Sequence, residues 1–144
     1  MSVSPRRRIV DVRVGEALPP LEMEISLTAL VVYAGATWDF HRYHYDQALA
    51  EKAGSPAPFM DGQMAGALMA RQLMSWAGPD AFVRKLSFRL RNMVCAGERI
   101  VLAAHVTKVT PGEGIGLVEL ALSVEKADGT EVVREASATV ELPI

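Results

Sequence analysis

The second half of the chain alternates hydrophobic and polar residues with a period of two. In residues 83–94, Leu86, Phe88 and Leu90 alternate with charged or polar neighbours, as in a strand that buries one face. Three similar stretches follow, at residues 97–109, 115–127 and 130–142. The turn sequences CAGE, TPGEG and ADGT precede them in that order. We therefore predict four consecutive long strands joined as an antiparallel meander.

A long apolar segment precedes these strands. Asp61 is placed to cap the start of a helix, and Gly78-Pro79 is a stop signal. Between them, apolar side chains cover most of the helical circumference; they are Met64, Ala65, Ala67, Leu68, Met69, Leu73, Met74 and Trp76. A helix that is apolar on nearly all sides is expected to be buried.

The N-terminal part of the chain predicts shorter elements. Residues 8–27 alternate but are interrupted by Pro19-Pro20, which indicates two short extended pieces around a turn. Two short helices are expected next, at residues 28–37 and 45–54. Residues 1–7 are expected to form a loose tail, with the basic cluster Arg6-Arg7-Arg8 solvated.

These elements fit one architecture. An antiparallel β-sheet wrapped around a long central α-helix, the α+β hot-dog fold, accommodates every predicted element. We therefore predict a single domain over residues 1–144. One such sheet does not cover both ends of its helix, so pairing of sheet edges between two chains, to give a dimer, is expected.

Composition and charge narrow the classes of function. Hydrophobic residues make up 50% of the chain and the formal net charge is −2, so a nucleic-acid partner bound through a basic surface is not expected. The longest apolar stretch, residues 64–70, is too short to span a bilayer, and no signal peptide is visible, so a cytoplasmic setting without membrane contact is expected. Cys95 is the single cysteine and is expected to be a small buried or half-buried residue and not a nucleophile.

The segment WDFHRYHYD, residues 38–46, concentrates aspartates, histidines and aromatic rings. If Asp39 and His44 point into the same cavity, they can hold a water molecule and transfer its protons, because histidine titrates near neutral pH. Addition of water beside a carbonyl also needs a donor for the enolate oxygen. The backbone N–H of Gly62, at the start of the buried helix, can supply it, and the absence of a side chain allows close approach.

Residues 34–54, AGATWDFHRYHYDQALAEKAG, together with the glycine-led helix that follows, resemble the hydratase signature of the MaoC-like, (R)-specific enoyl-CoA hydratase family. The stretch FRLRNMVCAGERI is similar to a later strand and turn of that family, and the resemblance covers most of residues 14–110. It places the family's two aspartates, its histidine and its oxyanion glycine on Asp39, Asp46, His44 and Gly62.

The resemblance implies a cofactor-independent reaction, the reversible syn addition of water to a trans-2-enoyl thioester of CoA or acyl carrier protein. Asp39 and His44 would activate the water and return a proton to C2, and the Gly62 N–H would hold the thioester oxygen. The family's Asn-Pro-Ile is replaced by His41-Arg42-Tyr43, and the residue before the glycine, often histidine, is Asp61. These bulky replacements disfavour the usual straight-chain substrate.

Further residues are candidates for substrate binding: His41, Met60, Asp61, Met64, Arg89 and Arg91. The methionines are core residues that could also line an acyl tunnel. The arginines could meet CoA phosphates, although solvated positions on their strand are the simpler interpretation. Asp46 is interpreted mainly as a helix cap. A zinc site from Asp39, His41, His44 and Asp46 matches no tight metal motif, and no metal is expected.

Two other functions remain open. A hot-dog thioesterase would need a carboxylate for hydrolysis, often on the central helix, and this helix has none after Asp61. The chain could instead be one subunit of a heteromeric hydratase, paired with a related hot-dog chain that helps to shape a pocket for a bulky acyl group. The altered His41-Arg42-Tyr43 segment fits such a pairing.

Overall fold

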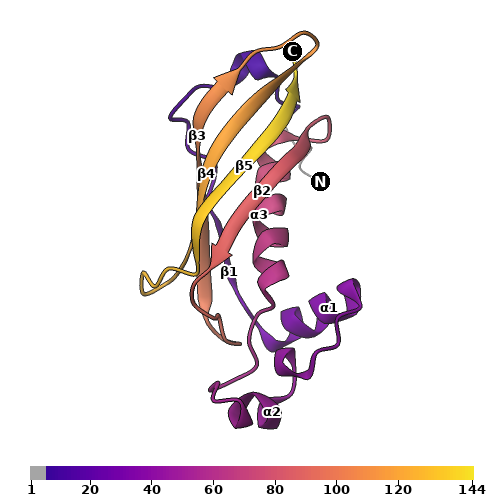
Figure 1. Cartoon of the computed structure of the whole chain (residues 1–144), viewed down its shortest axis with the longest axis vertical. Coiled ribbons are helices and arrows are strands. Elements are labelled where there is room, and N and C mark those ends of the chain that lie inside the picture. The colour runs from indigo at the N-terminus through magenta and orange to yellow at the C-terminus, as the bar shows by residue number, and fades with distance from the viewer. Residues whose placement is uncertain (1–5) are drawn as a thin grey trace.

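The computed structural model describes residues 6–144, so most of the predicted loose tail lies outside the described residues. A five-stranded antiparallel sheet curves along one long helix, and two short helices lie beyond the N-terminal end of that helix (Figure 1). This arrangement confirms the predicted α+β hot-dog fold. The elements are α1 (Leu27–Thr37), α2 (Gln47–Lys52), α3 (Gly62–Ala77), β1 (Leu21–Glu24), β2 (Phe82–Leu90), β3 (Arg99–Thr110), β4 (Ile115–Lys126) and β5 (Val133–Pro143).

The strand order is β1-β3-β4-β5-β2. Strands β3, β4 and β5 form the expected meander, but β2 pairs with β5 and not with β3, so the prediction of a four-strand meander was wrong at its first strand. Both edges of β3 are occupied, by β1 (Leu21 opposite Leu102) and by β4, and β2 takes the free edge of β5 (Leu90 opposite Val133). Strand β2 therefore forms one outer edge of the sheet.

The first predicted extended piece is also different. Ile9–Asp11 forms a turn of 3-10 helix, and Ala17 makes an isolated bridge with His105, so only the second piece becomes a strand, β1. Ile9 and Val12 are both buried, and this spacing of three suits a 3-10 turn better than a strand. The alternation in this segment therefore does not mark the buried face of a strand. The residues that it buries are Ile9 and Val12.

Arg6 and Arg8 of the basic cluster are exposed, as predicted, but Arg7 is half-buried and tied to the far end of α3, so the prediction of a solvated tail was wrong for Arg7. The Arg7 N–H donates to the carbonyl of Ala77 at 3.2 Å, and the Arg7 guanidinium lies 4.9 Å from the Trp76 ring centroid. The same guanidinium forms an ion pair with Glu16, which also accepts a hydrogen bond from Trp76 Nε1 at 3.0 Å. Arg6 pairs with Asp80 at 3.4 Å. These contacts fasten the N-terminal segment to the helix.

Glu16 is expected to make the free energy of unfolding depend on pH in the acidic range. Burial alone would raise the pKa of its carboxyl, but hydrogen bonds from Trp76 and Arg7 outweigh burial and lower the pKa below its ordinary 4.5. This stabilisation is present above that ordinary value and is lost as pH falls through the lowered one. Glu16→Gln should reduce the free energy of unfolding at neutral pH by about 1–2 kcal/mol and flatten its decline in acid.

Denaturant unfolding between neutral and acidic pH measures this effect. Asp80→Asn is the matched control, because it removes an exposed ion pair from the same end of the molecule and should change stability little. An acid dependence in Glu16→Gln equal to that of the unsubstituted protein would contradict the prediction.

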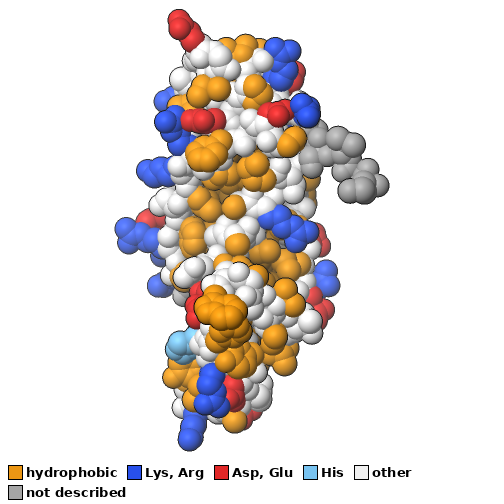
Figure 2. All heavy atoms as spheres, turned by 90° about the vertical axis from the view of Figure 1, so that its right-hand side faces the viewer, with side chains coloured by type: hydrophobic (Ala, Val, Ile, Leu, Met, Phe, Trp, Pro, Cys, Tyr) orange, Lys and Arg blue, Asp and Glu red, His pale blue; other side chains and the backbone are white. Residues whose placement is uncertain are grey.

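Helix α3 forms the centre of the core. The Asp61 side chain caps it by accepting from the Gln63 N–H at 3.0 Å, and Gly78, at φ 92°, ends it, both as predicted. Met69 and Leu73 are fully buried against the sheet. In the single chain one side of α3 stays open, with Ala67 among its exposed residues. Figure 2, which views the side of Figure 1 where α1, α3 and β2 lie, shows apolar side chains gathered on this face.

Candidate active site

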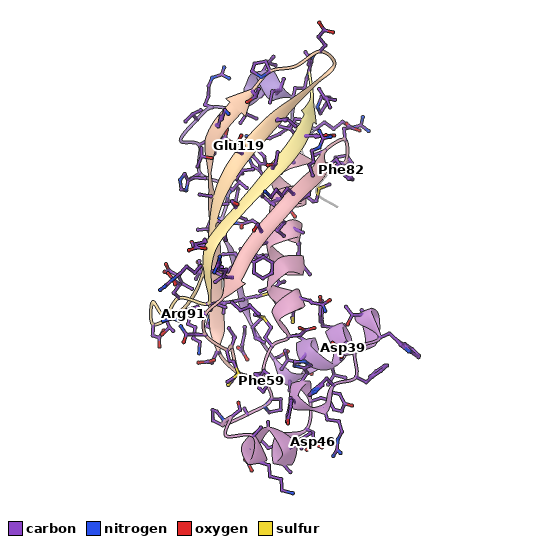
Figure 3. All side chains as sticks on the ribbon, in the orientation of Figure 1. Asp39, Asp46, Phe59, Phe82, Arg91 and Glu119 are labelled. Atoms are coloured by element: carbon purple, nitrogen blue, oxygen red, sulfur yellow. The ribbon has the colours of Figure 1, made fainter. Side chains whose placement is uncertain are left out.

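The segment that carries Asp39 begins with a sharp reversal after α1. Trp38 ends that helix in the left-handed conformation, at φ 60°, and the Asp39 N–H donates back to the carbonyl of Ala34 at 3.0 Å. This turn directs Asp39 toward the start of α3 (Figure 3). Arg42–His44 then forms a 3-10 turn, and Asp46 caps α2 by accepting from the Leu49 N–H at 3.1 Å, as the sequence indicated.

Asp39 and His44 line one small cavity, together with Asp61. The cavity volume is about 10 Å³, which is roughly the space that one water molecule needs. One polar side-chain atom from each of these residues lies within 4.8 Å of the others. The other lining residues come from α1 and α3: Leu30, Tyr33, Ala34 and Met64. The cavity therefore has a polar side made by three ionisable groups and an apolar side.

Backbone groups hold each of the three polar side chains by one atom. His44 Nδ1 lies 2.7 Å from the carbonyl oxygen of Phe59. A carbonyl cannot donate, so Nδ1 carries the hydrogen, and in the neutral ring Nε2 is left as an acceptor. Asp39 Oδ1 accepts from the His41 N–H at 3.3 Å, and Asp61 Oδ1 accepts from the Gln63 N–H at 3.0 Å. The second oxygen of each carboxylate and His44 Nε2 make no hydrogen bond to another described residue.

His44 also borders a second, larger space. A cleft of about 210 Å³ runs between the start of α3 and the end of β2, and its apolar lining includes Phe59, Met60 and Leu90. Gly62 lines the cleft as well, and its N–H makes no hydrogen bond to any other described residue. An added Cβ at Gly62 would lie 2.2 Å from Leu90 Cδ1, so this site requires glycine while Leu90 keeps its position.

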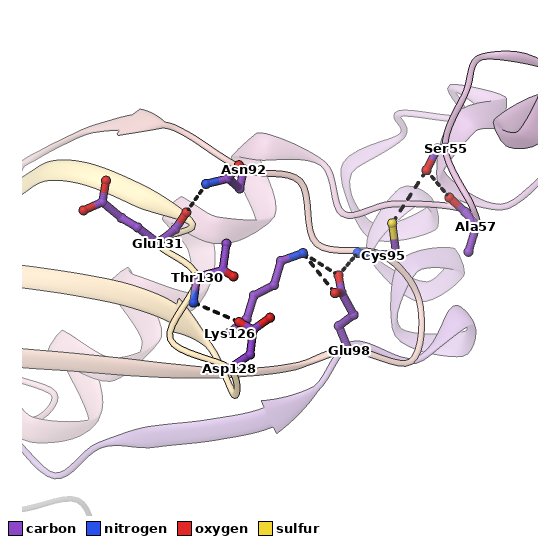
Figure 4. Close-up of polar contacts among 9 residues, drawn as sticks. All are labelled: Ser55, Ala57, Asn92, Cys95, Glu98, Lys126, Asp128, Thr130 and Glu131. Atoms are coloured by element: carbon purple, nitrogen blue, oxygen red, sulfur yellow. Dashed lines mark hydrogen bonds and ion pairs between the residues drawn. The ribbon is translucent and has the colours of Figure 1, made fainter.

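The loop after β2 forms part of the wall of this cleft. Arg91 is exposed at the end of β2 (Figure 3) and lines the cleft, as do Asn92, Met93 and Val94, which follow it. Figure 4 shows how polar contacts fix this loop. Glu98 accepts from the Cys95 N–H at 2.7 Å and from Lys126 Nζ at 2.9 Å, and Asn92 Nδ2 donates to the carbonyl of Glu131 at 2.7 Å. These contacts hold in place the loop that forms this part of the cleft wall.

Glu98→Ala should destabilise the protein by about 2–3 kcal/mol, because it leaves the Cys95 N–H and the largely buried Lys126 ammonium without their acceptor. Glu119→Ala is the matched control, since its ion pair with Lys108 is longer, at 3.6 Å, and exposed. Equal midpoints of urea unfolding for the two variants would contradict this ranking.

The structure gathers some of the candidate residues and leaves others apart. Asp39, Asp61 and Met64 line the small cavity, Met60, Gly62 and Arg91 line the cleft, and His44 lines both.

His41 is exposed and lies against Tyr43, with ring centroids 4.6 Å apart, and lines neither space. Arg89 is exposed and paired with Glu135 at 2.8 Å. Among the described residues, neither His41 nor Asp46 joins the group formed by Asp39, His44 and Asp61.

Sequence reasoning did not single out Tyr33. It stands in the apolar stretch TALVVYAGAT, where an aromatic residue suggests core packing. The structure places it, half-buried, in the wall of the small cavity. Burial, then the charge of Asp61, then that of Asp39 raise the pKa of its hydroxyl above the ordinary 10.0. Tyr33 therefore stays protonated at physiological pH and can donate a hydrogen bond.

A family model described as "MaoC like domain" matches residues 12–127 of the chain. The chain belongs to the MaoC-like dehydratase family. Within it, the chain is 32% identical, over 99 residues, to the 3-oxo-4,17-pregnadiene-20-carboxyl-CoA hydratase beta subunit of Mycobacterium tuberculosis, covering 69% of this chain and 77% of that protein. The resemblance inferred from residues 34–54 is thereby confirmed.

Solved structures of other proteins share this fold. The ChsH1-ChsH2 complex from Mycobacterium tuberculosis contains a chain that matches with a TM-score of 0.81 at 28% identity, over 90% of this chain and 98% of that one. The (R)-hydratase from A. caviae involved in PHA biosynthesis matches with a TM-score of 0.82 at 21% identity, over 92% and 98%. No helix among residues 6–144 has the length and apolar character needed to cross a membrane.

Proposed function

We propose that this MaoC-like chain is a hydratase subunit that adds water to a trans-2-enoyl-CoA with a bulky, ring-bearing acyl group, and that it works beside a related hot-dog chain. The observation that carries the proposal is the position of His44, which borders both a cavity the size of one water and an apolar cleft. A nucleophilic water and an acyl group could thus be held on the two sides of one proton-transferring ring.

The proposed reaction uses groups of this chain. A water held by Asp39 and His44 Nε2 loses a proton to this pair as its oxygen bonds to C3 of the enoyl group. The electrons of the double bond move toward the thioester carbonyl, whose oxygen gains negative charge and accepts from the Gly62 N–H at the start of α3. The pair then returns a proton to C2. The reverse sequence is a dehydration.

The substrate proposal rests on two observations. The Mycobacterium tuberculosis relative that is 32% identical to this chain is named as the beta subunit of a 3-oxo-4,17-pregnadiene-20-carboxyl-CoA hydratase. The cleft in this chain is lined by apolar side chains, among them Phe59, Met60 and Met93, and Arg91 stands at its edge, where it could pair with a CoA phosphate. A heteromer therefore has more support than a homodimer that acts on straight-chain substrates.

The test is a hydration assay with trans-2-enoyl-CoAs that carry a short straight chain, a long straight chain or a ring system. The purified chain is assayed alone and mixed with a related hot-dog chain of the same organism, and the solution mass of each preparation is measured. We expect loss of the enoyl-thioester absorbance without release of thiol, fastest for the ring-bearing substrate and in the mixture. Release of free CoA would identify a thioesterase, and inactivity toward every substrate in both preparations would refute the proposal.

A further inference from the structure

The side chain of Leu90 lies over the first residue of α3. The three heavy atoms nearest to the position of a Cβ on Gly62 all belong to Leu90, with Cδ1 at 2.2 Å, Cγ at 3.4 Å and Cδ2 at 3.6 Å. Both residues line the cleft. If the Gly62 N–H holds the thioester oxygen, the carbonyl carbon and the attached C2 lie within two bonds of that oxygen and therefore close to Leu90.

A second glycine of α3 lets the rest of β2 approach the helix in the same way. A Cβ on Gly66 would lie 3.0 Å from Cε1 of Phe88, which is half-buried. Phe88 and Leu90 are two positions apart on β2, and Gly62 and Gly66 are one helical turn apart on α3, so both pairs lie on facing sides of the two elements (Figure 1). The contact between Phe88 and Gly66 thus holds the end of β2 against the start of α3.

A bulge in β5 lies beside this part of β2. Ser87 pairs with Ser137 and Arg89 with Arg134, so three steps along β5 match two steps along β2. Glu135 lies in this interval at φ 53°, a left-handed conformation that few residues other than glycine adopt. A bulge increases the local twist of a strand pair and can redirect the side chains beside it. The bulge therefore helps to set the direction of the last residue of β2.

Leu90 differs from the apolar residues at the bottom of the cleft in its exposure. Met60, Val94 and Val132 are at most 7% exposed and belong to the core, whereas Leu90 is 56% exposed. Met93 is also exposed, but none of its atoms is among the three nearest to Gly62. Leu90 therefore offers apolar surface to a bound acyl group, and its replacement removes little of the core.

We propose, on the basis of the hydratase function above, that Leu90 is a specificity-determining residue that limits the size of the substituent at C2, the carbon next to the thioester carbonyl. Its methyl groups occupy the space beside Gly62 that a larger C2 substituent needs. A smaller residue at this position accepts a larger substituent, and a larger residue accepts only a smaller one. The part of the cleft lined by Phe59 and Met60 remains for the rest of the acyl group.

The experiment compares the unsubstituted protein with Leu90→Ala and Leu90→Phe in the active assembly, on trans-2-enoyl-CoAs that carry hydrogen, methyl or ethyl at C2. We expect Leu90→Ala to raise the ratio of kcat/KM for the ethyl substrate to kcat/KM for the unbranched substrate by about tenfold or more, and Leu90→Phe to lower it by a similar factor. Affinities for saturated acyl-CoAs with the same C2 substituents, measured by calorimetry, should change in the same order.

Phe82→Ala is the matched control. Phe82 is an apolar residue at the other end of β2, is 63% exposed and does not line the cleft, so its replacement should leave both ratios unchanged. Unchanged ratios in both Leu90 variants, or an equal change in Phe82→Ala, would overturn the proposal. Failure of the unsubstituted assembly to hydrate any substrate would instead overturn the hydratase function on which the proposal rests, and the affinities for the saturated acyl-CoAs would still decide the role of Leu90.

Discussion

Asp39→Asn is expected to lower kcat for enoyl-CoA hydration by about 100- to 10,000-fold. The amide keeps the size of the carboxylate, and its oxygen can still accept from the His41 N–H, but it cannot take up a proton from the water. His44→Ala should have an effect of the same order, since it removes the ring that borders both spaces. Single-turnover hydration of a ring-bearing enoyl-CoA, with substrate affinity measured separately, checks both.

Asp46→Asn is the matched control for this loss. It changes an aspartate of the same short segment, but Asp46 caps α2 and pairs with Arg42 on the protein surface. Asparagine retains the cap, so activity should stay close to that of the unsubstituted protein. Turnover near the original level in both Asp39→Asn and His44→Ala would exclude the proposed chemistry.

Gly62→Pro is expected to lower kcat by about 100- to 1,000-fold, because proline removes the N–H proposed to hold the thioester oxygen. Gly62 is the first residue of α3, where the N–H has no helical partner and proline is well tolerated. Asp61, at φ −63° and ψ 140°, already has the extended conformation that a residue before proline prefers. The substitution should therefore remove one donor without breaking the helix.

The comparison requires space for the new side chain. Both Gly62→Pro and its control Gly62→Ala should be made in a Leu90→Ala background, because Leu90 Cδ1 lies only 2.2 Å from the position of an added Cβ. Gly62→Ala keeps the N–H, so it should retain much more activity than Gly62→Pro at similar thermal stability. Equal activities in the two variants would show that this N–H does not take part in the reaction.

Local patterns in the sequence predicted most of the elements. The apolar run between Asp61 and Gly78 predicted α3, and alternation predicted β2 to β5, because burial imposes the period of each element directly on its residues. Strand pairing was predicted less well. Alternation shows that residues 82–90 form a strand, but whether it joins β3 or β5 depends on β1, a short strand far away in the sequence that occupies the other edge of β3.

The candidate site was predicted where its residues are close in sequence. Asp39 and His44 stand five positions apart and could be proposed as a pair, and the structure brings them to one cavity. Tyr33 could not be singled out, because in an apolar helix a tyrosine indicates packing. Its approach to Asp61 depends on how α1 docks on the start of α3, which no local pattern records. His41 shows the converse, since it belongs to the motif yet faces outward.

Leu90 is the last residue of β2, remains 56% exposed, covers Gly62 and forms part of the cleft wall. Any protein chain that adds a strand beside β2 would therefore also lie close to the cleft in which we propose that the acyl group binds. In that case the partner subunit would help to set the substrate specificity. Exchanging that subunit would change the shape of the proposed acyl-binding cleft and leave Asp39 and His44 unchanged.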